Sequence, residues 1–210
     1  MLITAVSRAA LLAMALSFAM AAQAASQGAD RTACEGGPGA SMDTVIEACT
    51  AVIDSGQARG EPLAVAYSNR AVARISRHEY DLAIADLNQA IKIDSGFAEA
   101  YVNRGAARML KRDYEMAIRD YTEAIRLDPK SSAAYHSRGW VYFLLGQYQN
   151  VIGDMTEALK FNPNFPESLY IRGCARRRTG DIAGGDADIA AAKALKPGVA
   201  EEYATYQVFP

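Results

Sequence analysis

Hydrophobic and small residues recur along this chain at helical spacing, and residues 98–129 give the pattern most clearly. Within that stretch one face repeats every three or four residues, first at Tyr101, Gly105 and Arg108 and then at Ala117, Tyr121 and Ala124. Pro129 follows, and a proline cannot continue a helix. The pattern therefore predicts two short helices joined by a tight turn at residues 111–113.

The same helix–turn–helix pattern returns at a spacing of 34 residues. The columns that keep this step hold a small residue, a proline, an alanine and an aromatic residue. Their members are Gly105, Gly139 and Gly173; Pro129, Pro163 and Pro197; Ala90, Ala124, Ala158 and Ala192; and Tyr67, Tyr101 and Tyr135. Such a period predicts an all-α fold, a right-handed α-solenoid of antiparallel helical hairpins.

This order of aromatic, small, alanine and proline columns resembles the tetratricopeptide repeat family, in its bacterial exported type. The resemblance covers four full repeats, at residues 64–97, 98–131, 132–165 and 166–199. Mild departures from the family pattern are Ser95, Leu169 and the pair Gly184-Gly185. The resemblance implies the solenoid fold and a role in binding another molecule, but not the identity of that molecule.

The residues outside the four repeats predict an arm and two end elements. Residues 25–41 include Gly36-Gly37-Pro38-Gly39 and show no periodicity, so we expect a loop or flexible arm. Residues 42–54 resemble the second helix of a repeat whose first helix is missing, and residues 200–210 resemble a short cap helix. The predicted solenoid therefore spans residues 42–210, with a covering element at each end.

The first 24 residues have the composition of an export signal. Arg8 precedes an apolar run at 9–22 that is too short and too rich in alanine for a membrane-spanning helix. Ala22-Gln23-Ala24 then places small residues where a signal peptidase cleaves. We expect residues 1–24 to be a signal peptide, the mature protein to be periplasmic or secreted, and no stable membrane insertion after cleavage. The alternative is a buried N-terminal helix.

Composition and charge exclude several function classes. The formal net charge is −2, and the basic residues form no cluster of the kind that nucleic acid requires. The two histidines, His78 and His136, fall in different repeats without an adjacent nucleophile. Asp186 and Asp188 would diverge on a helix, so they do not predict a metal loop. We expect no enzyme activity, no metal site and no cofactor.

One column of arginines on the first helices matches one column of aspartates on the second helices. The pairs are Arg70 with Asp86, Arg104 with Asp120, Arg138 with Asp154, and Arg172 with Asp188. In an antiparallel hairpin these residues lie at the same height, which predicts structural ion pairs. The alternative is an arginine ladder that binds an acidic ligand.

The three cysteines predict two different roles. Cys174 lies beside Gly173 on a helix face, which indicates a buried thiol. Cys34 lies in the arm and Cys49 on the half-repeat, and in an exported protein this pair predicts a disulfide.

The family resemblance also implies where a ligand would bind, since one face of each first helix lines the concave surface of such repeats. The residues assigned to a peptide or protein ligand on this basis are Val102, Asn103, Ala106, Met109, His136, Ser137, Trp140, Phe143, Glu167, Tyr170 and Arg177. The basic partners of a carboxylate clamp are missing from this face. We expect the centre of binding near Trp140, the single tryptophan. The alternative places Trp140 and Phe143 in the core between helices.

Two hypotheses for function follow. The first is a non-catalytic exported scaffold or adaptor that holds a peptide or protein segment in the concave groove. The second is a structural subunit of a cell-envelope complex that associates through its convex face or its ends, which would include homo-oligomers. The sequence names neither the partner nor the pathway.

Overall fold

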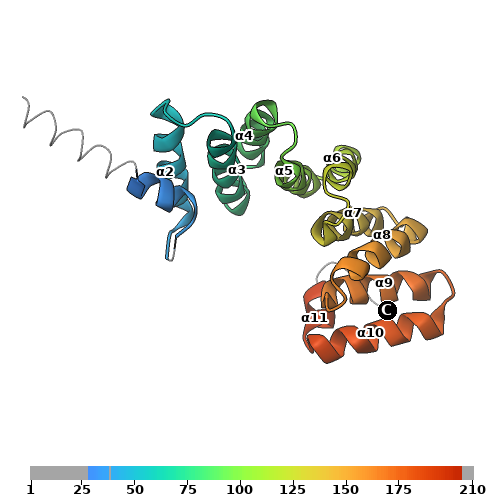
Figure 1. Ribbon diagram of the computed structural model, residues 1–210. Coiled ribbons are helices and arrows are strands. Elements are labelled where there is room, and N and C mark those ends of the chain that lie inside the picture. The colour runs from blue at the N-terminus through green and yellow to red at the C-terminus, as the bar shows by residue number, and fades with distance from the viewer. Residues whose placement is uncertain (1–27, 38, 205–210) are drawn as a thin grey trace, which may run out of the picture. The chain divides into compact units, whose positions relative to one another are not determined.

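The computed structural model describes residues 28–37 and 39–204, and every regular element among them is helical (Figure 1). The labelled helices are α2 (Met42–Asp54), α3 (Glu61–Ser76), α4 (Tyr80–Ile93), α5 (Ala98–Leu110), α6 (Tyr114–Leu127), α7 (Ser132–Leu144), α8 (Tyr148–Phe161), α9 (Pro166–Arg178), α10 (Ile182–Leu195) and α11 (Val199–Ala204). Within each of its two compact units, consecutive helices pack against one another, and the predicted all-α solenoid architecture is confirmed.

Two parts of the sequence-based interpretation lie outside the described residues. These are the predicted signal peptide, residues 1–24, and residues 205–210 of the predicted cap; residues 25–27 and 38 of the predicted arm lie outside them as well. Among the helices that the structure does describe, none combines the length and apolar character needed to cross a membrane.

The chain divides into two compact units, with the boundary between Asp94 and Ser95. In the first unit, α3 packs against α2 and against α4. The second unit contains the hairpins α5–α6, α7–α8 and α9–α10, followed by α11 (Figure 1). Here α6 contacts α7, α8 contacts α9, and the first helices α5, α7 and α9 also contact one another in order.

Small residues allow the two helices of each hairpin to approach closely. A Cβ added to Gly105 would lie 2.7 Å from the ring of Tyr121, and one added to Gly173 would lie 2.8 Å from the backbone oxygen of Gly185. Gly185 is equally restricted, because its own added Cβ would lie 2.7 Å from the oxygen of Gly173. The glycine that departs from the family pattern in α10 therefore permits a backbone-to-backbone contact between α9 and α10.

The turn within each hairpin places one residue in the left-handed region. This residue is His78, Arg112, Gly146 or Gly180, with φ of 62°, 65°, 70° and 95°. The turns are closed by backbone hydrogen bonds such as that from the Asp113 N–H to the Arg108 oxygen, at 2.9 Å. Because a side chain crowds the backbone in this conformation, His78 and Arg112 occupy positions better suited to glycine.

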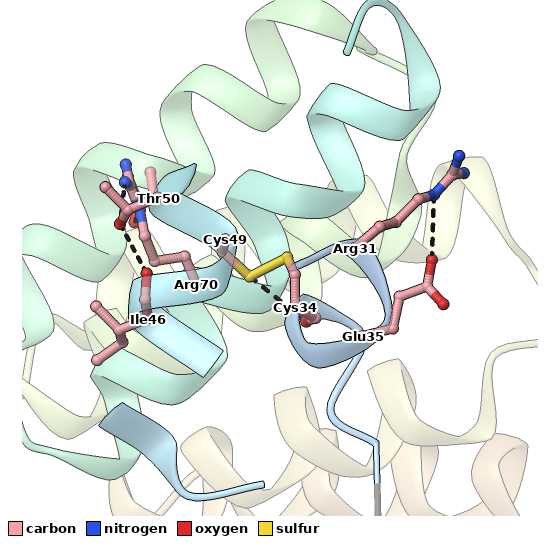
Figure 2. The surroundings of a disulfide bond; sticks show 8 residues. Arg31, Cys34, Glu35, Ile46, Cys49, Thr50 and Arg70 are labelled. Atoms are coloured by element: carbon pink, nitrogen blue, oxygen red, sulfur yellow. Dashed lines mark hydrogen bonds and ion pairs between the residues drawn. A yellow bond between two sulfur atoms is a disulfide. The ribbon is translucent and has the colours of Figure 1, made fainter. Parts of the chain in front are cut away.

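The N-terminal arm differs from its sequence-based expectation. Residues 28–34 form a short helical segment, so a loop was the wrong prediction for that part of 25–41. The predicted disulfide is present and joins Cys34 of this segment to Cys49 of α2, with 4.6 Å between the Cα atoms (Figure 2). Both cysteines are buried in one cluster with Val45 of α2 and Ala66 of α3. The disulfide and this cluster hold the segment against α2, which local periodicity could not reveal.

Candidate functional site

The four predicted Arg–Asp pairs are all present, each within its own hairpin. The closest nitrogen–oxygen distances are 2.8 Å for Arg70–Asp86, 2.7 Å for Arg104–Asp120, 2.8 Å for Arg138–Asp154 and 2.8 Å for Arg172–Asp188. In each pair the arginine Nε and Nη2 donate to the carboxylate, and the aspartate is buried. This geometry favours the structural interpretation over an arginine ladder for an acidic ligand.

A second arginine, which the sequence analysis missed, contacts three of these carboxylates. Arg74, Arg108 and Arg176 follow the first arginine by one helical turn and lie 2.6, 2.7 and 2.8 Å from the aspartate of the same hairpin. Tyr142 occupies the equivalent position in the third repeat. The spacing of four residues on the first helices was the available signal, because side chains so spaced share one face.

Threonines connect three of the pairs to the preceding helix. Nη1 of Arg70, Arg138 and Arg172 donates to the hydroxyl oxygen of Thr50, Thr122 and Thr156, respectively. Figure 2 shows the first of these contacts, in which Thr50 of α2 lies beside Arg70 of α3. The arginine column therefore also helps to fix the packing of neighbouring hairpins.

The predicted ligand-binding residues of α5 lie along its partly accessible face. Val102, Asn103, Ala106 and Met109 are all half-buried. Val102 and Met109 pack against the cluster formed by Ala117, Tyr121 and Val141, which ties their inner surfaces to the hairpin core.

Two predicted binding residues of α7 are engaged by the protein itself. His136 lies with Nδ1 2.8 Å from the hydroxyl oxygen of Ser168, and its ring stacks on Phe165 at 4.6 Å. Burial lowers the pKa of His136 to about 4, although the charge of Glu167 opposes this shift. The imidazole is therefore neutral near pH 7 and helps to join α7 to α9. Ser137 forms a hydrogen bond with Tyr121, whose pKa is raised by burial.

The C-terminal helix α11 covers the predicted centre of binding. The ring of Tyr203 lies 5.4 Å from that of Trp140 and 5.8 Å from that of Tyr170, measured between centroids. Trp140 also stacks on Phe143 at 5.9 Å. Phe143 is buried, as the core alternative required, whereas Trp140 remains half-buried beneath α11. We call Trp140, Tyr170 and the adjoining surface of α7 and α9 the aromatic site.

Charged residues around the aromatic site are paired. Glu167 accepts from Lys196 at 2.8 Å, and Lys196 also pairs with Glu202 of α11. Arg177 pairs with Asp186. The guanidinium of Arg178 lies 5.0 Å from the ring centre of Phe143. The basic run at 176–178 is thus engaged by groups of the same unit.

Cys174 is a free buried thiol beneath the aromatic site, as its position on the helix indicated. Its side chain forms a hydrogen bond with Tyr170, and burial raises the pKa of the thiol to about 11. Burial likewise raises the pKa of Tyr170 to about 12. Both groups are uncharged near neutral pH, which suits a surface that packs against an aromatic ring.

The first unit holds a cavity of about 690 Å³ that the sequence analysis did not anticipate. Its walls come from the helical segment at 28–34, α2, the linker that follows α2, and α3. Val65 and Asn69 of α3 line it together with Arg31 and Arg59, which gives a mixed apolar and charged surface. Part of the cavity wall comes from the arm. Because the Gly-rich sequence of the arm predicts a loop, it indicates neither the helical segment nor the cavity.

His78 and His136 belong to different hairpins. Within residues 28–37 and 39–204, no group of three or more His, Cys, Asp and Glu side chains is placed to hold a metal ion. His78 lies at a turn, with Nδ1 2.7 Å from the hydroxyl of Tyr80.

Comparisons with protein-family models match the middle of the chain. The Tetratricopeptide repeat model matches residues 98–131, a TPR repeat model matches 71–111, and a second Tetratricopeptide repeat model matches 120–151. No curated protein sequence matches the chain.

Solved structures with the same fold include MamA and YrrB. A crystal structure of MamA has a TM-score of 0.66 at 21% identity, over 79% of this chain and 92% of that chain. MamA from Desulfovibrio magneticus RS-1, from residue 41 to its end, has a TM-score of 0.64 at 16% identity, over 75% and 86%. YrrB, described as a TPR protein with an unusual peptide-binding site, has a TM-score of 0.63 at 24% identity, over 77% and 85%. At these identities the likeness shows the fold alone.

Proposed function

Because the chain is a tetratricopeptide-repeat protein, we propose that it is a non-catalytic scaffold that binds a peptide or protein segment along the first helices of its second unit. These first helices, α5, α7 and α9, contact one another in order. Their predicted ligand-binding face runs from Val102 and Met109 on α5 to the aromatic site on α7 and α9. We call this surface the first-helix face.

The observation that carries this proposal is the position of α11. A short helical segment already lies on the first-helix face and places its tyrosine against Trp140 and Tyr170. The surface therefore has the shape and chemistry to accommodate a polypeptide segment. The description of YrrB as a protein with a peptide-binding site gives independent support for peptide binding by this fold.

We also propose that the protein is exported and works in the periplasm or outside the cell. The composition of residues 1–24 motivates this, and the Cys34–Cys49 disulfide supports it, because such bonds persist in oxidising compartments. Intact-mass analysis of protein recovered from its source cells provides the test. We expect a chain that begins at Ala25, with one alkylated cysteine when no reductant is added; an uncleaved chain with three alkylated cysteines would contradict export.

Binding is tested by capturing a partner on the immobilised mature chain and synthesising the segment that binds. Ala106 lies half-buried on α5, so Ala106→Arg places a long charged side chain on the first-helix face. We expect this change to weaken binding of the synthetic segment at least tenfold. The matched control is Ala187→Arg at an exposed position of α10. Equal affinity of the two variants would exclude the first-helix face as the binding surface.

A second candidate function is self-association, or incorporation into an envelope complex, through other surfaces. Exposed apolar side chains favour self-association. Leu82 and Ile182 lie at the start of the second helix of their hairpins, α4 and α10, and are 50% and 48% exposed. Light scattering across a concentration series separates the two functions. A monomer at every concentration would remove the self-associating form of this candidate.

A further inference from the structure

We infer that the aromatic site is a docking site for a short amphipathic helix of a partner protein, and that α11 is the resident occupant which such a helix displaces. This inference rests on the proposed function and specifies the class of its ligand. It differs from the role of an end cap, because a cap covers the last repeat permanently.

The apolar contacts of α11 define what the site recognises. Val199 is fully buried and Tyr203 is 8% exposed, and these residues lie four positions apart on one face of the helix. Tyr203 contacts Trp140 from the third repeat and Tyr170 from the fourth, so a single ring joins two hairpins. The site therefore selects a branched aliphatic residue followed four positions later by an aromatic residue.

An ion pair adds a charge preference to this pattern. Glu202 directly precedes the tyrosine and pairs with Lys196, which also holds Glu167 of α9. A ligand with an acidic residue just before its aromatic anchor would reproduce this contact. A basic residue there would face Lys196 and be disfavoured.

The attachment of α11 is suited to exchange. The helix has six residues, and a helix this short has little stability of its own. Lys196, Pro197 and Gly198 join it to α10, and a Cβ added at Gly198 would meet nothing within 4 Å. Pro197 and Gly198 are exposed, and one backbone hydrogen bond, from the Val199 N–H to the Lys196 oxygen at 3.0 Å, closes the turn. Opening therefore costs the contacts of one helical face, whereas the rest of the unit keeps its hairpin packing.

The covalent connection to α10 explains why α11 normally occupies the aromatic site. A segment joined through a three-residue connection competes at an effective concentration in the millimolar range, so a free ligand must bind more tightly or meet a weakened occupant. The apparent dissociation constant of any ligand equals its intrinsic value divided by the fraction of molecules in which α11 has left the site. A substitution in α11 should then raise the affinity of the site for an added helix.

The test uses the mature full chain and a fluorescein-labelled synthetic peptide of residues 197–210 as the probe. We expect the chain with Tyr203→Ala to bind this probe at least ten times more tightly than the unchanged chain, measured by anisotropy. A probe that itself carries Tyr203→Ala should lose this gain. Adding Trp140→Ala to the Tyr203→Ala chain should abolish binding. Equal affinity of the unchanged and Tyr203→Ala chains would overturn the inference.

A charge exchange covers the case in which Tyr203→Ala disturbs folding at the end of the unit. The chain with Lys196→Glu should open α11 through repulsion from Glu202 and should prefer a probe with Glu202→Lys over the unaltered probe. The same preference in the unchanged chain, or none in the variant, would overturn the proposed charge contact.

If a captured segment binds the first-helix face equally in unchanged and Tyr203→Ala chains, displacement is wrong while the proposed function stands. If no segment binds that face, the proposed function itself fails. Light scattering of the unchanged chain, which keeps Tyr203, identifies exchange of α11 between two copies, an outcome that would replace a foreign partner as the ligand.

Discussion

The loss of one arginine should cost far more in the third repeat than in the second. Asp120 contacts both Arg104 and Arg108, whereas in the third repeat Arg138 pairs with Asp154 and Tyr142 stands in place of the second arginine. Arg104→Ala therefore leaves Asp120 with a cation 2.7 Å away. Arg138→Ala removes the bidentate partner of a carboxylate whose side chain is only 9% exposed.

The expected magnitudes follow from this difference. Stranding a buried carboxylate costs about 3 kcal/mol of the free energy of unfolding, and we expect this for Arg138→Ala. Loss of one charged hydrogen-bonding partner while another remains should cost about 1.5 kcal/mol, and we expect this for Arg104→Ala. The two variants should thus differ by more than ~1 kcal/mol, although both substitutions lie in the second unit.

Urea denaturation followed by circular dichroism measures this difference through the midpoint and slope of the transition. A rescue variant sharpens the test, because Tyr142→Arg in the Arg138→Ala chain supplies the second arginine seen in the other repeats. It should recover at least half of the lost stability. Equal losses for Arg104→Ala and Arg138→Ala, with no rescue, would show that the second arginine does not support the carboxylate.

Three further expectations concern stability. Arg112→Gly should raise the free energy of unfolding by about 0.5–1 kcal/mol, because glycine adopts the left-handed φ of 65° without steric strain. An Arg112→Ala control should bring no such gain, and the urea midpoints of the two variants measure the difference. Gly173→Ala should cost about 1–3 kcal/mol of the free energy of unfolding, since its Cβ would meet the backbone oxygen of Gly185 at 2.8 Å. Gly139→Ala mainly meets the flexible end of the Met155 side chain and should cost less than ~1 kcal/mol. Equal shifts of the thermal midpoint for the two variants would refute this distinction. Burial lowers the pKa of His136 to about 4 in the folded chain, whereas the ordinary value of 6.5 applies to the unfolded chain. The unfolded chain therefore binds the proton first as the pH falls, and about 2 kcal/mol of stability should be lost between pH 6.5 and pH 5. His136→Gln should remove this part of the pH dependence of the urea midpoint, and an unchanged profile would contradict the assignment.

The sequence was most informative where an interaction repeats with the period of the fold. The Arg–Asp pairs could be predicted because both columns return with every repeat and an antiparallel hairpin places them at one height. The small-residue column was recognised by the same period, and the structure shows that its glycines lie where two helices approach closely.

Features that occur once could not be obtained in this way. The helical segment at 28–34 contains no repeat signal, and its position depends on a disulfide and a buried cluster. The place of α11 over Trp140 depends on contacts between residues 63 positions apart, which no local pattern reports. For the same reason, the sequence could assign Trp140 to the ligand-binding face without showing that the chain's own tyrosine covers it.

The most direct test of peptide binding on the first-helix face is the emission spectrum of Trp140 during titration with the segment identified by capture. Trp140 is the single tryptophan of the chain, so a change in emission reports on the aromatic site. We expect a saturable spectral shift for the full chain, retained in Ala187→Arg and lost in Ala106→Arg at the same concentrations. Binding of the segment without any change in the Trp140 spectrum would place the site elsewhere and contradict the account.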